Sequence, residues 1–508
     1  MQNLGTNIAG IVAFLVLARL ISPREMGIWA VLQLIVAACS TFVTWFPQSV
    51  TKFVAENSSR GSRAAASAAF YQALRANLIT YLPMILGLYF GAPVLASHLF
   101  GDISYAPLIR VLAFDVFLNA GALQVLVAAL LGLGMFRETA FAGLVTGGIF
   151  RQILILALIV LMRNFIGLVI GWLISDAILV LIYLFLVVRV LGTPRFDFPL
   201  MKLFRFYLPL ELAQIVSFAQ NWFDRALLVL FVPLGTLGVY NVALAAYGVV
   251  GNVSISMSSM LFPALTSIDE SKGRNALRDA IRTGTRYPCL MVTPLDFILF
   301  ATAMPALALF VGQSYVGGFM PLMIFCAADA FTLFATVLYP ALMAIEETAV
   351  VGEIRALTAV VGMVTAYLLL PAWGIAGASV GRACAIVLTA ILQFFAVKRK
   401  ISLRLDFQLI IKTLIAGTTA AAVVVAVQLL KYSEFMLPVY VTVGAAVYLM
   451  MLRLLRAVDA NDFDLLRKFL GKRLALIANL LESLLLPSNP RERDINECGK
   501  DASVVDYS

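Results

Sequence analysis

The chain has 508 residues, of which 62% are hydrophobic and only 13% are charged. This composition excludes an ordinary soluble globular protein, because such chains carry roughly 25% charged residues. The formal net charge of +9 comes from lysines and arginines that gather in alternate loops, so it gives no reason to predict nucleic-acid binding. We therefore expect an all-α polytopic membrane protein.

Fourteen stretches of the chain are long and apolar enough to be spanning helices, each of which needs about 20 such residues. The first stretch has no signal-peptide cleavage site, so we interpret it as a retained span. Because the connections are short, no sizeable soluble domain is expected. In chain order the stretches lie roughly at 4–20, 28–48, 72–96, 107–132, 139–161, 165–188, 207–231, 237–262, 288–311, 319–343, 349–370, 375–396, 408–430 and 436–455.

An internal repeat organises these spans. The segment Pro107 to Phe117 reads PLIRVLAFDVF, and 214 positions later Pro321 to Phe331 reads PLMIFCAADAF. Further pairs follow in the same order, among them Gly61 with Gly273 and Glu138-Thr139-Ala140 with Glu347-Thr348-Ala349. Such an ordered series indicates a duplicated unit.

The repeat distance encloses six spans, an even number, so both copies should cross the membrane in the same sense. We predict two parallel six-helix lobes, at about 1–190 and 200–400, with the substrate path between them. Two additional spans occupy 405–456. Residues 457–508 are predicted to form an amphipathic helix at the cytoplasmic surface, followed by a polar tail.

The positive-inside rule sets the predicted orientation. The loops on one side contain only Arg24, Arg163 and Lys431, so both termini are predicted to be cytoplasmic and the protein to lie in the cell membrane. The loops on the other side contain Lys52, Arg60, Arg63, Arg137, Arg189, Arg195, Lys202, Arg205, Lys272, Arg274, Arg278, Arg282, Arg286, Lys398, Arg399, Lys400 and Arg404.

Three basic residues in or beside the early spans are candidate substrate contacts. Arg151 lies about twelve residues, or ~18 Å, into the fifth span, too deep to reach the membrane surface easily. It should therefore either face an aqueous cavity or pair with a neighbouring carboxylate. Arg75 and Lys52 lie nearer the cytoplasmic edge, where extension to the interface or a role in fixing topology competes with substrate binding.

The seventh span carries a polar stripe. At 100° per residue, Glu211, Gln214, Asn221 and Arg225 fall within an arc of about 80° on an otherwise apolar helix. Such a stripe should line water or another polar helix. We predict that these four residues contribute to a substrate cavity.

Asp115 and Asp329 occupy matching positions in the repeated segment, each about eight residues, or ~12 Å, from the outer end of its span. A carboxylate at that depth is neutral, paired or wetted by a cavity. We interpret the two aspartates as candidate ion-coupling residues. A hydrogen bond between helices is the equally weighted structural alternative.

Four segments of the chain are similar to signatures of a known family. They are LARLISPREMGIWAV at 17–31, DRALLVLFVPLGTLGVYNVA at 224–243, LFPALTSI at 261–268 and LPAWGIAGASVGRA at 370–383. The chain thus resembles the polysaccharide-type lipid-linked oligosaccharide flippases of the multidrug/oligosaccharidyl-lipid/polysaccharide (MOP) exporter superfamily. The resemblance implies an architecture like that of the multidrug and toxin exporters (MATE), and coupling to an H⁺ or Na⁺ gradient.

The leading functional prediction is a transporter, not an enzyme, that flips a polyprenyl-pyrophosphate-linked oligosaccharide to the outer leaflet for polysaccharide or glycoconjugate biosynthesis. We expect a monomer in contact with membrane lipids, working with glycosyltransferases or a polymerase, and needing no cofactor or metal. An ion-coupled multidrug or toxin exporter of the same superfamily is the main alternative. A membrane-embedded glycosyltransferase or ligase is a remote one, because no outer loop is long enough to hold catalytic carboxylates.

Overall fold

The computed structural model describes residues 10, 13–43, 46–401 and 405–459. Within these residues the regular structure is helical and contains no β-strand, so the prediction of an all-α fold is confirmed. Residues 4–9 and 11–12 of the predicted first span, 4–20, lie outside the described residues. So do the predicted surface helix and the polar tail from residue 460 onward.

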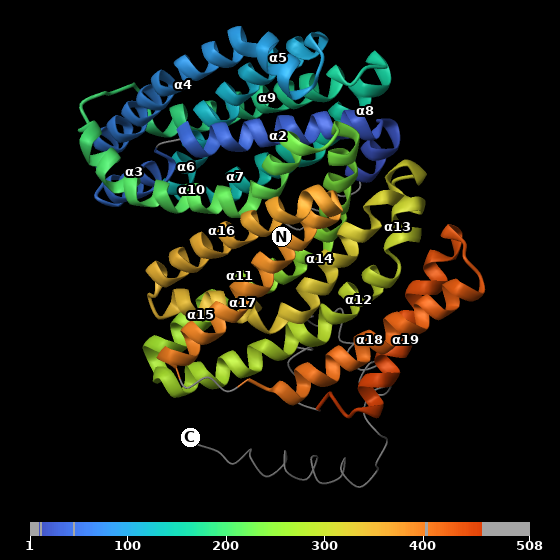
Figure 1. Ribbon diagram of the computed structural model, residues 1–508. Coiled ribbons are helices and arrows are strands. Elements are labelled where there is room, and N and C mark those ends of the chain that lie inside the picture. The colour runs from blue at the N-terminus through green and yellow to red at the C-terminus, as the bar shows by residue number, and fades with distance from the viewer. Residues whose placement is uncertain (1–9, 11–12, 44–45, 402–404, 460–508) are drawn as a thin grey trace.

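The first group of helices precedes residue 192 (Figure 1). Two of its segments, η2 and η3, are π-helical insertions within longer spans. The elements are α2 (Pro23–Val43), α3 (Pro47–Ser59), α4 (Arg63–Leu99), η1 (Ile103–Tyr105), α5 (Ala106–Val116), η2 (Phe117–Leu123), α6 (Gln124–Gly132), α7 (Phe136–Ala142), η3 (Gly143–Phe150), α8 (Arg151–Met162) and α9 (Ile166–Leu191).

The second group begins after an exposed connection at residues 192–199. The elements are α10 (Leu200–Phe231), α11 (Leu234–Met291), α12 (Thr293–Ala301), α13 (Ala303–Phe310), η4 (Gln313–Gly318), α14 (Phe319–Thr332), η5 (Leu333–Val337), α15 (Leu338–Ala344), α16 (Thr348–Trp373), α17 (Ile375–Lys400), α18 (Phe407–Leu430), η6 (Glu434–Met436) and α19 (Leu437–Leu454).

Length and composition qualify 11 of the described helical segments as membrane spans, or 12 when the pair Asn275–Ala301 and Ala303–Phe310, bent by 77°, is taken as one. Helix α10 is long enough but is not among them, because polar residues such as Glu211, Gln214 and Asn221 interrupt its apolar sequence. The chain is a polytopic membrane protein. The predicted total of fourteen spans stays a prediction, since residues 4–9 and 11–12 of the first span are not described.

The duplicated segments have matching local structure. Helix α5 follows the 3₁₀ turn η1 and leads through η2 into α6, and helix α14 follows η4 and leads through η5 into α15. Gly61 and Gly273, paired in the sequence repeat, both take left-handed backbone angles, with φ of 72° and 74°. Glycine suits this conformation because it has no Cβ. The sequence repeat therefore corresponds to a repeated order of elements.

The hydrophobic cores are distributed unequally along the molecule. We call the end that carries Lys52, Arg189, Lys202 and Lys398 the basic end. Near it lie two separate cores, one built from residues between Phe46 and Leu203, and one from residues between Leu265 and Ile401. Toward the opposite end a single large core joins residues of both groups, from Leu17 to Val169 and from Leu228 to Ala378.

Two glycines allow close approach of the halves at the end opposite the basic end. A Cβ on Gly27 of α2 would lie 1.8 Å from the carbonyl oxygen of Leu234, and one on Gly238 of α11 would lie 2.0 Å from that of Pro23. Because no side chain fits there, the two backbones pack directly. Tyr315 adds a hydrogen bond of 2.9 Å from its hydroxyl to the carbonyl oxygen of Ile21. In this conformation the halves are joined at that end.

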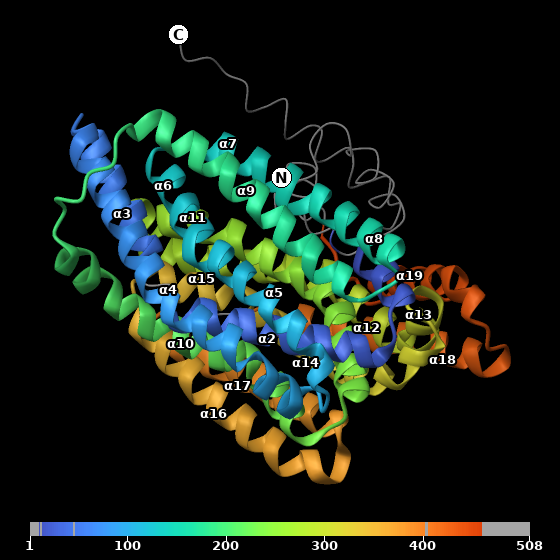
Figure 2. The ribbon, with the colours of Figure 1, turned by 90° about the horizontal axis from the view of Figure 1, so that it is seen from above.

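Helices α18 and α19 lie at one edge of the molecule, as Figure 2 shows. They pack on each other and against α12, and they share a core that includes Phe297, Ala421 and Tyr440. Gly417 of α18 meets the ring of Phe297 directly. The two additional helices therefore flank the second half.

Candidate functional site

The main candidate site is a cavity of about 740 Å³ in the second half. Its walls come from α10, α11, α14, η5, α15, α16 and α17, and apolar side chains such as Phe223, Ile255 and Met343 form part of them. A larger set of uncharged polar side chains also lines it: Gln220, Asn221, Ser254, Ser258, Ser259, Thr332, Thr336, Tyr339, Thr389 and Gln393. The cavity is thus lined by apolar side chains with polar groups placed among them.

Three charged side chains face this cavity: Asp329, Arg355 and Arg382. Two of them are cations and one is a carboxylate. The two arginines differ in their partners, and that difference decides what each can bind.

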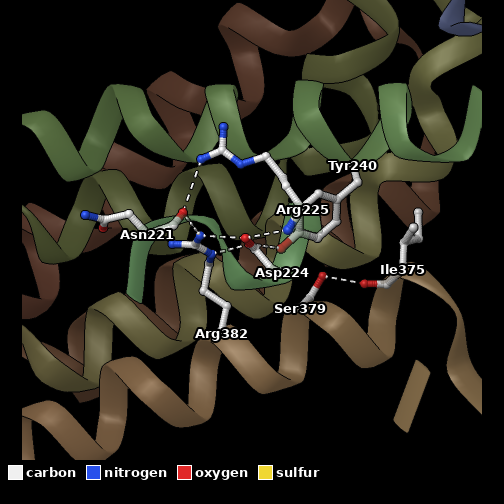
Figure 3. A network of polar contacts seen from close by, with 7 residues as sticks. All are labelled: Asn221, Asp224, Arg225, Tyr240, Ile375, Ser379 and Arg382. Atoms are coloured by element: carbon white, nitrogen blue, oxygen red, sulfur yellow. Dashed lines mark hydrogen bonds and ion pairs between the residues drawn. The ribbon is translucent and has the colours of Figure 1, made fainter. Parts of the chain in front are cut away.

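Arg382 of α17 is held by a buried network (Figure 3). Its Nη2 lies 2.9 Å from Oδ1 of Asp224 and donates at 2.7 Å to the carbonyl oxygen of Asn221, while its Nε contacts the other carboxylate oxygen of Asp224. Asp224 is fully buried and also accepts a hydrogen bond from the Tyr240 hydroxyl. Buried charges require this kind of pairing, so the network joins α10, α11 and α17 and neutralises Arg382.

Arg355 of α16 has no carboxylate within ion-pair distance among the described residues. Its Nη1 donates at 3.2 Å to the Ser217 hydroxyl, and its guanidinium lies 5.2 Å from the ring centroid of Tyr339. Both contacts leave the positive charge uncompensated. Arg355 is therefore the side chain in this cavity best suited to bind an anion.

The predicted stripe on α10 divides into two parts. Asn221 lines the cavity, and Arg225 donates at 3.3 Å to the Asn221 carbonyl oxygen while its guanidinium lies 3.7 Å from the Trp222 ring. Glu211 is buried away from the cavity lining and accepts a hydrogen bond from Tyr207. Gln214 is exposed. Of the four predicted residues, Asn221 thus lines the cavity and Arg225 contacts Asn221, while Glu211 and Gln214 lie elsewhere.

Arg151 both pairs with a carboxylate and lines a cavity, the two alternatives that the sequence left open. Its Nη2 forms an ion pair with Asp176 of α9, and its Nε lies 3.4 Å from the Ser175 hydroxyl. The same side chain lines a smaller cavity of about 220 Å³ in the first half, together with Trp29 and Trp172. Arg151 is therefore neutralised and also adjacent to open space.

Lys52 and Arg75 lie at the basic end, outside the linings of both cavities. Both side chains are exposed. The Lys52 ammonium lies 4.1 Å from the Phe206 ring centroid, and the Arg75 guanidinium lies 4.9 Å from that of Phe196. These contacts resemble cation–π pairs at a membrane interface.

The two candidate coupling residues lie in different surroundings. Asp115 is completely buried, and neither of its carboxylate oxygens has a hydrogen-bond partner among the described residues. Asp329 faces the larger cavity and accepts a hydrogen bond of 3.3 Å from Tyr247. Asp296 of α12, also fully buried, lies near enough to Asp329 for the two carboxylates to interact electrostatically.

Sequence reasoning missed the Asp224–Arg382 pair and Arg355. Asp224 and Arg382 were visible as charged residues inside two of the segments that carry the family resemblance, at 224–243 and 370–383. Arg355 was visible as an isolated cation in the first turns of the eleventh predicted span. A search that paired opposite charges between predicted spans would have proposed the first two as partners.

A family model described as "Polysaccharide biosynthesis protein" matches residues 16–318, more than half of the chain. The chain belongs to that family. No curated protein matches the chain. The match confirms the polysaccharide-biosynthesis part of the resemblance that the sequence indicated.

Solved structures show the same fold. The lipid II flippase MurJ in an inward closed conformation matches with a TM-score of 0.71 at 14% identity, over 89% of this chain and 96% of that one. An inward-facing MATE family multidrug resistance transporter of the MOP superfamily matches with a TM-score of 0.63 at 16% identity, over 79% and 95% of the two chains. A point mutant of the Vibrio cholerae MATE transporter VcmN gives 0.52 at 14% identity, over 78% and 98%.

These likenesses establish the fold, which is that of MOP-superfamily transporters. The matched proteins are transporters and flippases, in agreement with the prediction that this chain is not an enzyme. Because a flippase and two MATE transporters all share the fold, the substrate has to be argued from the cavity.

Proposed function

We propose that this chain flips a polyprenyl-pyrophosphate-linked oligosaccharide from the cytoplasmic to the outer leaflet by alternating access, for polysaccharide or glycoconjugate biosynthesis. The observation that carries the proposal is Arg355, a cation without a carboxylate partner among the described residues, on the lining of a cavity of about 740 Å³. A guanidinium binds phosphate oxygens in a bidentate manner. The pyrophosphate would bind there.

The remaining lining suits the sugar part of such a substrate. Gln220, Asn221 and Gln393 provide amide donors and acceptors, and several serine and threonine hydroxyls accompany them. Sugars present many hydroxyl groups, each of which can donate and accept hydrogen bonds, so a site with both kinds of group is complementary. Membership of a polysaccharide biosynthesis family supports the same class of substrate.

The distribution of cores supports alternating access. The halves share a large core at one end, whereas at the basic end the described cores are joined only through the start of α10, where Leu203 packs into the core of the first half. The basic end can therefore open with a smaller loss of shared apolar contact. If the basic end faces the cytoplasm, as the positive-inside rule predicts, the substrate enters from the side on which it is synthesised.

The proposal also covers the motion of the lobes, the topology, the partners and the energy source. The lobes at 1–190 and 200–400 would rock against each other, with the pair at 405–456 attached to the second. Both termini would be cytoplasmic in a monomer in the cell membrane, working with glycosyltransferases or a polymerase. An H⁺ or Na⁺ gradient would drive the cycle through Asp115 or Asp329.

A multidrug exporter remains the second candidate function, because one observation favours it. Asp329 is the carboxylate on the cavity lining, and Tyr247 and Tyr339 lie beside the same space. An acidic group with aromatic neighbours would suit an organic cation. The substrate assay must therefore include one.

The test reconstitutes the purified protein in vesicles and follows a fluorescent lipid-linked oligosaccharide and a cationic dye in parallel. We expect the oligosaccharide to move. Arg355→Gln should slow it by at least ~10-fold, because a hydrogen bond to a charged group contributes about 1.5–3 kcal/mol, and Arg355→Lys should retain part of the rate. Arg399→Gln is the matched control, since it removes an exposed arginine at the end of α17. Movement of the dye alone, or an unchanged rate in Arg355→Gln, would contradict the proposal.

A further inference from the structure

The first half contains a buried charge cluster that the substrate cavity does not use. It consists of Asp115 at the end of α5, Arg151 at the start of α8 and Asp176 in the middle of α9. Both aspartates are completely buried, and the Arg151 side chain is 20% exposed toward the cavity of about 220 Å³.

The hydrogen bonds within this cluster are divided unequally. Asp176 has a partner for each oxygen, because Arg151 pairs with Oδ1 and the Asn119 amide donates to Oδ2 at 2.7 Å. Asp115 has none among the described residues, although Arg151 is near enough for its charge to act on it. One guanidinium thus serves the first carboxylate and leaves the second without a partner.

Counting charges shows what the cluster lacks. Two ionised carboxylates and one guanidinium would leave a negative charge in the membrane interior, where an ionised side chain without compensation costs at least ~2.5 kcal/mol. Helices α2, α4 and α9 also pack on α5. Among the described charged groups on these helices and on α8, Arg151 is the one whose charge acts on Asp115. A positive charge must come from elsewhere.

The chemistry of Asp115 favours a proton over a metal cation. Hard cations bind several oxygen ligands at once, but no polar atom of the described residues lies within hydrogen-bond distance of the Asp115 carboxylate. The described residues also contain no cluster of three potential metal ligands. A proton needs a single oxygen and no further ligand.

The backbone around the cluster is irregular at two points. The π-helical segment η2 begins two residues after Asp115 and contains Asn119, and the π-helical segment η3 ends at Phe150, directly before Arg151. π-Helical insertions occur frequently at functional sites. The adjacent cavity gives the Arg151 side chain open space in which to change its rotamer.

We propose that Asp115 is a proton-binding site and that Arg151 is the positioning residue that exchanges between the two aspartates. In the loaded state Asp115 is a neutral acid and Arg151 pairs with Asp176, as in the structure. In the unloaded state the O–H bond of Asp115 has broken, its electron pair stays on the carboxylate, the proton has passed to water in the small cavity, and Arg151 has turned to Asp115. Asp176 then keeps its hydrogen bond from Asn119. The cluster carries one net negative charge in this state, and that charge favours the binding of the next proton at Asp115.

This inference deepens the proposed function, since a proton-coupled carrier needs such a site, and it assigns Arg151 to coupling instead of substrate binding. It is tested without any substrate. If the oligosaccharide assay fails and the test below succeeds, the first half still binds a proton and only the cargo is wrong. The reverse result would leave a flippase whose coupling lies elsewhere.

The test uses infrared difference spectroscopy of the full chain in lipid, which detects the carbonyl band of a protonated carboxylic acid. Asp115→Asn should remove one such band. Asp176→Asn should remove the same band, because Arg151 is then released to pair with Asp115 and ionises it. The comparison is repeated in a protein that carries Asp296→Asn, which changes a buried carboxylate of the second half. Adding Asp115→Asn to that protein should remove the same band as it removes from the wild type.

Two outcomes would overturn the proposal. Without a band difference in Asp115→Asn, Asp115 carries no proton. If the band survives in Asp176→Asn, Arg151 does not exchange. Thermal unfolding provides the second measurement, because asparagine mimics a neutral acid in size and polarity. Asp115→Asn should therefore unfold at about the wild-type temperature, and loss of the folded protein in this variant would show that an ionised, paired Asp115 is required.

Discussion

The two halves of this protein share an order of helices but differ in how their buried charges are paired. In the first half Arg151 is paired with Asp176 beside a cavity of about 220 Å³. In the second half Arg382 is paired in the same way, yet Arg355 extends into a cavity of about 740 Å³ without a carboxylate partner among the described residues. The comparison teaches that duplication preserved the order of helices, while the placement of single charges distinguishes the halves.

The largest effect is expected from breaking the Asp224–Arg382 pair. Arg382→Met should lower the free energy of unfolding by about 3–5 kcal/mol, because it leaves Asp224 charged and fully buried. Chemical unfolding in detergent measures this. Arg399→Met, at an exposed position on the same helix, is the control.

A double variant sharpens this prediction. Asp224→Leu combined with Arg382→Met removes both charges and should recover most of the lost stability. If Arg382→Met alone unfolds like the wild type, the pair contributes nothing to the second half.

The next effect concerns the contact where the halves are joined. Gly27→Ala places a Cβ 1.8 Å from the Leu234 carbonyl oxygen, a clash that should cost up to ~3 kcal/mol in this conformation. Spin labels at Arg60 and Lys398, one in each half at the basic end, should then move closer as the opposite end separates.

Gly238→Ala should shift the same distance in the same direction, because its Cβ would meet the Pro23 carbonyl oxygen. Gly91→Ala is the control, since no atom lies within 4 Å of its added Cβ. If only one of Gly27→Ala and Gly238→Ala shifts the distance between the spin labels, the halves do not contribute equivalently to this contact.

A smaller effect is expected in the first half. Asn119→Ala leaves Oδ2 of Asp176 without its donor, which should lower the free energy of unfolding by about 1–2 kcal/mol. Gln214→Ala, at an exposed position on α10, should change it by less than ~0.5 kcal/mol. Equal unfolding curves for the two variants would show that Arg151 alone satisfies Asp176.

The smallest effect should come from Tyr247→Phe in the second half. The Tyr247 hydroxyl donates to Asp329 at 3.3 Å, a long hydrogen bond, so its loss should cost about 1 kcal/mol or less. Thermal unfolding compares it with Tyr367→Phe, which changes an exposed tyrosine on α16. A loss of several kcal/mol would mean that Asp329 depends on this contact much as Asp224 depends on Arg382.

The sequence predicted the fold well, because a membrane requires long apolar helices and a duplication leaves similar residues in the same order in both copies. Gly61 and Gly273 share both sequence context and backbone conformation. The span count was harder to derive, because α10 carries enough polar side chains to weaken its apolar signal.

The site was predicted only in part. Helical periodicity placed Asn221 and Arg225 on one face of α10, and the structure brings them together. Periodicity says which face a residue occupies but not which helix lies opposite. The partner of Asp224 is 158 residues away, so tertiary packing alone pairs it with Arg382.

The shared core opposite the basic end has a consequence for the resting transporter. Opening that end would expose apolar side chains of both halves, such as Leu32, Leu237 and Tyr240, to water, whereas the described core shared at the basic end is limited to the contact of Leu203 with the first half. A carrier without cargo should therefore rest sealed on one side. That seal acts as a permeability barrier, which limits the leak of small ions through idle molecules and helps to preserve the gradient on which the cell depends.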